Sequence, residues 1–196
     1  DKKVLVVDMD PQYNSSMSFN VFNANKSIYK VFSNEIDITK SIQNLDVFYD
    51  SIIVIGVGGS LNATTALANA LESRYSNFSS DKQLKPIIYL GYHLDESIIQ
   101  KTLKSTENLH PLIVVVSKSG STLEPNIIWS IVDQYMVYRF GVNEVKKRTI
   151  IITDSNCGPL RKIAKFNNYL SYEIPENIGG RFSALTAASL VPLALS

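Results

Sequence analysis

The chain is poor in cysteine and has no long apolar run. Cys157 is its single cysteine, so no internal disulfide can form and no zinc site can be built from paired thiolates. This use of cysteine is typical of a reducing compartment, and we expect a cytoplasmic protein without a metal. The longest aliphatic runs, such as LIVVV at 112–116, are far shorter than the ~20 residues that span a bilayer. We therefore expect no membrane partner.

An excess of charge of either sign is also absent. The sequence has 19 Lys and Arg against 18 Asp and Glu, which gives a formal net charge of +1. A general basic field that would attract nucleic acid is therefore missing, and we expect no nucleic-acid partner. Any site for an anion must be local. With 45% hydrophobic residues, the composition is that of a globular domain.

Apolar segments and amphipathic segments alternate along most of the chain. Five segments rich in Val, Ile and Leu occur at 51–56, 85–91, 112–117, 149–153 and 168–175. The first four are nearly continuous apolar runs, as in parallel strands covered on both faces. Segments with apolar residues at helical spacing separate or follow them, at 62–75, 95–106, 124–140 and 158–166. This order predicts an α/β fold, a doubly wound and mainly parallel five-stranded sheet with helices on both faces.

Residues 1–50 give weaker signals. A strand is possible at 2–8 and a short helix at 37–45. Asp8 and Asp10 follow the possible strand and could together bind Mg²⁺, as in a phosphotransferase. A solvated turn closed by Pro11 explains the same residues, and ordinary turn chemistry favours it.

A glycine-rich turn, GVGGSLNATT at 56–65, follows the first predicted strand. A dinucleotide fingerprint would need Gly or Ala where Leu61 stands, and a P-loop would need a lysine that this turn lacks. Glycines allow the backbone to approach a ligand, and we expect Ser60 to cap a helix that begins near Leu61. A tight turn without a ligand is the alternative.

A loop rich in hydroxyls follows the third predicted strand. It consists of Ser117, Lys118, Ser119, Gly120, Ser121 and Thr122. Ser121 and Glu124 have the spacing of a capping box at the start of the next helix. A phosphate at a helix start is bound by free amides, hydroxyls and a nearby ammonium together, whereas capping alone accounts for one or two hydroxyls. The loop therefore predicts an anion site, at the same sheet edge as the glycine turn.

Arg181 follows two glycines after the fifth predicted strand, which places it at this edge too. The glycines imply a constrained backbone that aims the guanidinium, although an ordinary surface arginine is the alternative. We expect Ser183 to cap the apolar helix that follows. The apolar face of residues 184–196 should then stay exposed in this chain alone, which would favour self-association or poor solubility.

Three stretches in this order resemble the glucose-6-phosphate isomerase family, and specifically the first of its two sugar isomerase (SIS) domains. They are IGVGGS (55–60), VVVSKSGSTLEP (114–125) and ENIGGRFSALTAASLVPLAL (176–195). The resemblance implies a three-layer SIS domain at 51–196, with 1–50 as an amino-terminal extension packed on the core and the second SIS domain absent. It also implies the conversion of glucose 6-phosphate to fructose 6-phosphate in glycolysis and gluconeogenesis, without a cofactor, by a complete enzyme that is a homodimer.

The resemblance also assigns roles to individual residues. Arg181 is the catalytic residue that faces the reacting carbons, and the phosphate is held by Ser117, Ser119 and Thr122 with the backbone and charge of Lys118. Glu124 lies toward the sugar, and the remaining substrate-binding residues are Gly58, Gly59, Ser60, Ser121 and Gly180.

Some features of the family are missing. Asn62 and Ala63 stand where the family has Leu-Gly, and the catalytic glutamate and ring-opening histidine belong to the second domain and to a neighbouring subunit. His93 and His110 match neither and are expected in loops near strand ends. We therefore expect this chain alone to be inactive. A non-catalytic SIS module of a regulator or an amidotransferase is the alternative, which the GGRFSALT segment disfavours.

Overall fold

The computed structural model describes residues 45–75 and 85–196, which belong to one compact unit of residues 38–196. Its centre is a five-stranded sheet in which every strand pairs with its neighbours in parallel. The strands are β1 (Ser51–Ile55), β2 (Ile87–Leu90), β3 (Pro111–Val116), β4 (Thr149–Asp154) and β5 (Leu170–Ile174), in the spatial order β2-β1-β3-β4-β5. The predicted α/β fold is confirmed. The strand and helix expected within residues 1–45, and the pair Asp8 and Asp10, lie outside the described residues except for Leu45.

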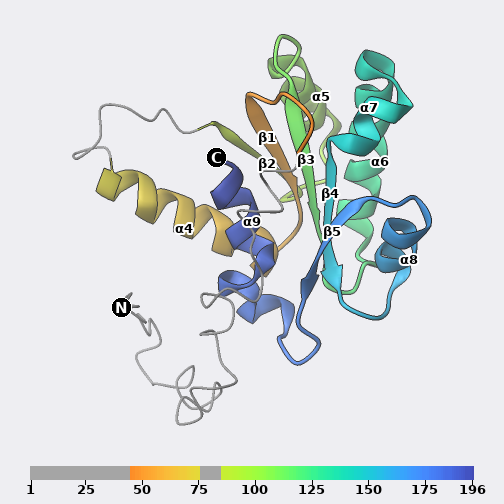
Figure 1. Ribbon diagram of the computed structural model, residues 1–196. Helices are drawn as coiled ribbons and strands as arrows, with labels where there is room; N and C mark the ends of the chain where they lie inside the picture. Colours follow the sequence, from red (N-terminus) through yellow and green to blue (C-terminus); the bar gives the residue numbers. More distant parts are fainter. Residues whose placement is uncertain (1–44, 76–84) are drawn as a thin grey trace. The chain divides into compact units, whose positions relative to one another are not determined.

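Both faces of the sheet are covered by apolar cores, which explains why the central strands β1 and β3 are nearly continuous apolar runs in the sequence. Ile52 and Val54 point into one core, and the intervening Ile53 and Ile55 point into the other. The first core is completed by α4 (Gly59–Tyr75) and α9 (Ala187–Leu195) (Figure 1). The second is completed by α5 (Glu96–Ser105), α6 (Leu123–Phe140), α7 (Val142–Lys147) and α8 (Pro159–Phe166). Successive side chains along a strand thus point to opposite faces of the sheet.

Three expected helix caps are wrong. Ser60 lies inside the first turn of α4 and donates to the carbonyl of Val57 at 2.9 Å. The N-cap of α6 is Thr122, so Ser121 and Glu124 form no capping box. Thr186, and not Ser183, caps α9, because Ser183 belongs to the 3₁₀ helix η1 (Gly180–Leu185). The cap positions of α6 and α9 are thus occupied by threonines that lie one and three residues after the expected serines.

Two further features differ from expectation. The apolar helix α9 is buried within this domain, since Ala188, Val191 and Leu195 pack against the sheet. The exposed apolar surface expected at this end of the chain is therefore largely covered. The helix α7 was not predicted from the sequence. It has six residues and starts after Gly141, which ends α6. A helix this short has too few residues for a clear periodic pattern.

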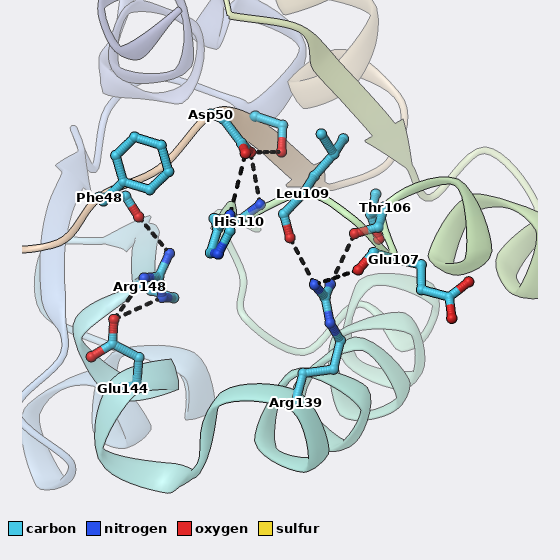
Figure 2. A network of polar contacts seen from close by, with 10 residues as sticks. Phe48, Asp50, Thr106, Glu107, Leu109, His110, Arg139, Glu144 and Arg148 are labelled. Carbon is cyan, nitrogen blue, oxygen red and sulfur yellow. Dashed lines mark hydrogen bonds and ion pairs between the residues drawn. The ribbon is translucent and has the colours of Figure 1, made fainter.

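A polar network closes the amino-terminal edge of the sheet (Figure 2). The guanidinium of Arg139 donates to the carbonyls of Thr106, Glu107 and Leu109, at 2.9, 2.8 and 2.8 Å. His110 lies before β3, with its ring nitrogen Nδ1 3.4 Å from a carboxylate oxygen of Asp50. Its place in a loop next to a strand is as expected. The carboxyl-terminal edge of the sheet carries a different set of groups.

Candidate functional site

The strand order creates a crevice at the carboxyl ends of β1 and β3. The chain continues from β1 to the edge strand β2 and then returns to the other side of β1 to form β3. In open parallel sheets this reversal leaves a gap above the carboxyl ends of the two strands. The glycine turn follows β1 and the hydroxyl loop follows β3, so the fold brings together the two segments that sequence analysis selected.

A pocket of about 440 Å³ lies at this edge. It is lined by Val57, Gly59, Ser60, Val116, Ser117, Lys118, Ser119, Thr122, Asp154, Cys157, Gly180 and Arg181. All predicted site residues are therefore in its lining except Gly58, Ser121 and Glu124. Lys118 and Arg181 are positive and Asp154 is negative, so the lining carries one net positive charge.

The hydroxyl loop is organised around Ser119. The Ser119 hydroxyl accepts hydrogen bonds from the amide and the hydroxyl of Ser121, both at 3.2 Å, and lies 3.2 Å from the Thr122 hydroxyl. The Ser117 hydroxyl accepts from the amide of Gly120 at 3.2 Å. Ser121 thus supports Ser119 instead of facing the pocket. This compact turn leads directly into α6, whose free first-turn amides favour an anion.

Glycine is required where the loop meets α8. Gly120 has a φ of +67°, and a Cβ at this position would lie 2.7 Å from the Cβ of Leu160. A Cβ on Gly158, just before α8, would lie 2.5 Å from the carbonyl oxygen of Ser119. The loop is therefore packed against the start of α8 at backbone distance, which fixes the positions of its hydroxyls.

The glycine turn and the arginine segment are in similarly close contact. A Cβ on Gly59 would lie 2.7 Å from the carbonyl oxygen of Gly180 and 2.8 Å from the Cα of Arg181. Among the described residues, the Arg181 guanidinium has no hydrogen-bond or ion-pair partner, and the side chain is exposed. The backbone of Arg181 is thus constrained while its charged group remains free to bind a ligand.

Asp154 and Cys157 line the pocket although no sequence motif selected them. A carboxylate oxygen of Asp154 accepts from the amides of Asn156 and Cys157, at 2.9 and 3.1 Å, and these hydrogen bonds lower the pKa of Asp154. The thiol of Cys157 lies 3.4 Å from the same oxygen, and the hydrogen bond and charge of Asp154 raise the pKa of Cys157. The one feature of the sequence that could have indicated these two residues is their position at the end of β4 and just after it, since β4 lies next to β3 in the sheet.

A second pocket, of about 380 Å³, lies between α5 and α6. Its lining is mainly aliphatic and consists of Leu94, Glu96, Ile99, Gln100, Leu103, Ile127 and Ile131. It contains none of the hydroxyls or cations of the first pocket, so the chemistry favours the crevice as the anion site.

Within residues 45–75 and 85–196, no three His, Cys, Asp or Glu side chains are grouped so that they could bind a metal ion. No helix in this part of the chain has the length and apolar character needed to cross a membrane.

One family model, described as an AAA domain, matches residues 1–87. The match includes β1 and the glycine turn, but Gly58 and Gly59 are followed by Ser60 and Leu61. The lysine that a P-loop uses to hold nucleotide phosphates is therefore missing from this turn.

The remaining comparisons agree with one another. Glucose-6-phosphate isomerase of Clostridium perfringens is 40% identical over 147 residues, which are 74% of this chain and 33% of that protein. The enzyme of Staphylococcus epidermidis is 32% identical over 163 residues, 83% of this chain and 35% of that protein.

Two solved structures share the fold. A glucose-6-phosphate isomerase from Chlamydia trachomatis has a TM-score of 0.65 and 19% identity, covering 98% of this chain and 33% of that one. The NanR protein of Vibrio vulnificus, solved in complex with ManNAc-6P, has a TM-score of 0.50 and 18% identity. The match covers 95% of this chain and 61% of NanR. The chain is thus homologous to the glucose-6-phosphate isomerases over about three quarters of its length, and it spans about a third of theirs.

Proposed function

We propose that this chain is the first SIS domain of a glucose-6-phosphate isomerase and supplies the enzyme's phosphate site and catalytic arginine. The observation that carries this proposal is that one pocket is lined by the hydroxyl loop at the start of α6 and by Arg181, whose guanidinium has no hydrogen-bond or ion-pair partner within residues 45–75 and 85–196. The phosphate of glucose 6-phosphate or fructose 6-phosphate binds the hydroxyls of Ser117, Ser119 and Thr122 together with the free amides of α6.

Arg181 then acts on the reacting end of the sugar. Isomerisation moves a proton between C2 and C1 and passes through an enediolate, whose developing negative charge a fixed guanidinium stabilises. The close contact between Gly59 and the backbone of Arg181 fixes the start of this side chain before the substrate binds. Gly59, Ser60 and Gly180 form the adjacent wall.

The described part of the chain offers a poor base for this proton transfer. Asp154 is the single carboxylate in the pocket lining, and its lowered pKa and its hydrogen bonds to two amides weaken it as a base. Glu124, expected toward the sugar, is not part of the lining. The base comes from the part of the enzyme that this chain does not span. The complete enzyme is a cytoplasmic homodimer that works in glycolysis and gluconeogenesis, with no cofactor or nucleic-acid partner.

Binding can be tested through Cys157, the chain's single cysteine, which is exposed and lines the pocket. Alkylation by iodoacetamide at about pH 8.5 should slow roughly tenfold when glucose 6-phosphate is present at ten times its Kd. Glucose, which lacks the phosphate, should not protect. Ser119→Ala should weaken protection, whereas Ser130→Ala, an exposed change on α6, should not. An unchanged alkylation rate with glucose 6-phosphate would refute the phosphate site.

Activity separates an enzyme domain from a binding module. Fructose 6-phosphate turnover is measured in a coupled assay with glucose-6-phosphate dehydrogenase, after removal of host isomerase. The chain alone should bind the sugar phosphate and give no turnover, because a positioned base supplies ~10² to 10⁴ in rate. Turnover that disappears with Arg181→Ala would place the base in this chain and contradict the division of roles.

A further inference from the structure

Lys118 connects two parts of the pocket that are far apart in the sequence. It follows Ser117 in the hydroxyl loop, and its ammonium reaches the segment that leads from β5 to Arg181. The ammonium donates to the carbonyl of Glu176 at 2.7 Å and makes a second, short hydrogen bond to the carbonyl of Ile178. These partners are main-chain atoms, 58 and 60 residues away along the chain.

The backbone of Lys118 is itself held in place. Its carbonyl accepts from the amide of Asp154 at 3.2 Å and from the hydroxyl of Thr153 at 3.3 Å. Both partners end the buried strand β4. The lysine therefore reaches from a fixed point in the sheet to a loop, and the loop is the part whose position the contact determines.

The loop that Lys118 holds carries Arg181. Between β5 and η1 the chain turns through two local hydrogen bonds, from the Ile178 amide to the Pro175 carbonyl at 3.0 Å and from the Phe182 amide to the Gly179 carbonyl at 2.9 Å. Neither bond ties the loop to the sheet. Gly59 packs against the backbone of Arg181 on one side, and the two bonds from Lys118 fix the segment just before it.

The two carbonyl acceptors also use most of the hydrogen-bond donors of the Lys118 ammonium. A lysine has three donors, and two of them are used within the protein. A phosphate in the pocket would therefore meet the hydroxyls and amides of the loop before it meets this cation. Hydrogen bonds from a charged group are among the stronger ones, so the link is worth more than an ordinary loop contact.

We propose that Lys118 is a positioning residue that fixes the Gly179–Arg181 turn against the hydroxyl loop and so places the Arg181 guanidinium over a sugar bound through its phosphate. The effect of Lys118 on a bound sugar rests on the proposed function. The link itself, the two hydrogen bonds from Lys118 to the carbonyls of Glu176 and Ile178, is present in the protein without a ligand. Lys118 acts on the substrate through Arg181, and not as a ligand of the phosphate.

The link is tested without a ligand by amide hydrogen exchange in the 196-residue chain. Lys118→Met keeps the aliphatic stem and removes the donors. Exchange at the amides of Ile178 and Phe182 should become about tenfold faster, while the amide of Ser117, bonded to Ile152 within the sheet, stays unchanged. Lys118→Arg should restore most of the protection. Lys146→Met, an exposed change on α7 at the opposite edge of the sheet, is the matched control. Equal exchange in wild type and Lys118→Met would overturn the link.

The effect of the link on substrate binding is tested with two probes, inorganic phosphate and glucose 6-phosphate. The affinity of each is measured from how it protects Cys157 against alkylation. Lys118→Met should leave the affinity for inorganic phosphate within about threefold and lower the affinity for glucose 6-phosphate about tenfold. In an Arg181→Ala background the same change should have little further effect, because the two residues act together. Equal losses for both probes would show that Lys118 binds the phosphate itself. Failure of the wild type to bind glucose 6-phosphate would refute the proposed function. The hydrogen-exchange experiment would still test the link, because it uses no ligand.

Discussion

Gly91 provides a sharp test of how the sheet supports the glycine turn. It follows β2 with a φ of +136°, and a Cβ there would lie 1.6 Å from the carbonyl oxygen of Gly56 and 2.7 Å from its carbonyl carbon. Gly56 is the first residue after β1, and its amide bonds to the Leu90 carbonyl at 3.0 Å. An alanine at position 91 therefore cannot fit unless the end of β2 or the start of the glycine turn moves.

The expected loss of stability has two parts. Holding a non-glycine residue at this φ costs about 1–3 kcal/mol. Displacing a backbone carbonyl in a packed region adds about 1–3 kcal/mol, as overpacking does elsewhere. Gly91→Ala should thus lower the free energy of unfolding by about 2–6 kcal/mol, a large share of the ~5–15 kcal/mol of a typical domain.

Gly141→Ala is the matched control for the backbone part. Gly141 has a φ of +80°, and a Cβ there would meet nothing within 4 Å. Urea unfolding followed by circular dichroism should give a loss for Gly91→Ala that exceeds the loss for Gly141→Ala by about 1–3 kcal/mol, at similar m values. Equal losses would refute the close approach of Gly91 to Gly56. If the Gly56 carbonyl is the group that moves, Gly91→Ala should also weaken the protection of Cys157 by glucose 6-phosphate; if the end of β2 moves instead, the protection should be unchanged.

Two further predictions concern the two ends of the sheet. The pKa of Asp154 is lowered in the folded state, so its contribution to stability is present above the ordinary aspartate pKa of about 4 and is lost as pH falls through the folded value. In urea unfolding measured from neutral to acid pH, wild type should therefore lose stability more steeply than Asp154→Asn, and parallel curves would contradict this. Arg139→Met removes three hydrogen bonds to carbonyls and should cost about 2–4 kcal/mol in the same assay, whereas Lys146→Met should cost little; equal midpoints would argue against the network of Figure 2.

The sheet was predictable because buried parallel strands need apolar residues on both faces. All five strands begin and end within two residues of expectation, and the largest differences are the starts of β2 at Ile87 and of β5 at Leu170, each two residues late. Helix starts were harder to predict, because a run such as that from Ser117 to Thr122 offers several possible caps. The path of this run is also constrained by the packing of Gly120 against Leu160, 40 positions further on. Local sequence does not contain that contact.

The site was predicted where local motifs carried it and was missed where topology did. The hydroxyls and Arg181 stood out by spacing, and the pocket contains both. Asp154 has no motif of its own and enters the pocket because β4 lies beside β3. The direction of the Lys118 side chain depends on carbonyls 58 and 60 residues away, so its charge could be recognised in the sequence but its partners could not.

The central place of β1 in the sheet has a consequence for how the chain folds. Its first residue pairs with Pro111, and the face it shares with α9 is closed by a hydrogen bond from the Tyr49 hydroxyl to the Leu195 carbonyl, across 146 positions. β1 is thus the earliest of the five strands in the chain, yet most of its contacts are with segments synthesised long after it. Loop closure over such distances costs entropy before the contacts form, which slows folding. During synthesis on the ribosome, Ile52 and Val54 of β1 lack the cover of α9 until that last helix emerges, so we expect chaperones to bind this short strand in the nascent chain.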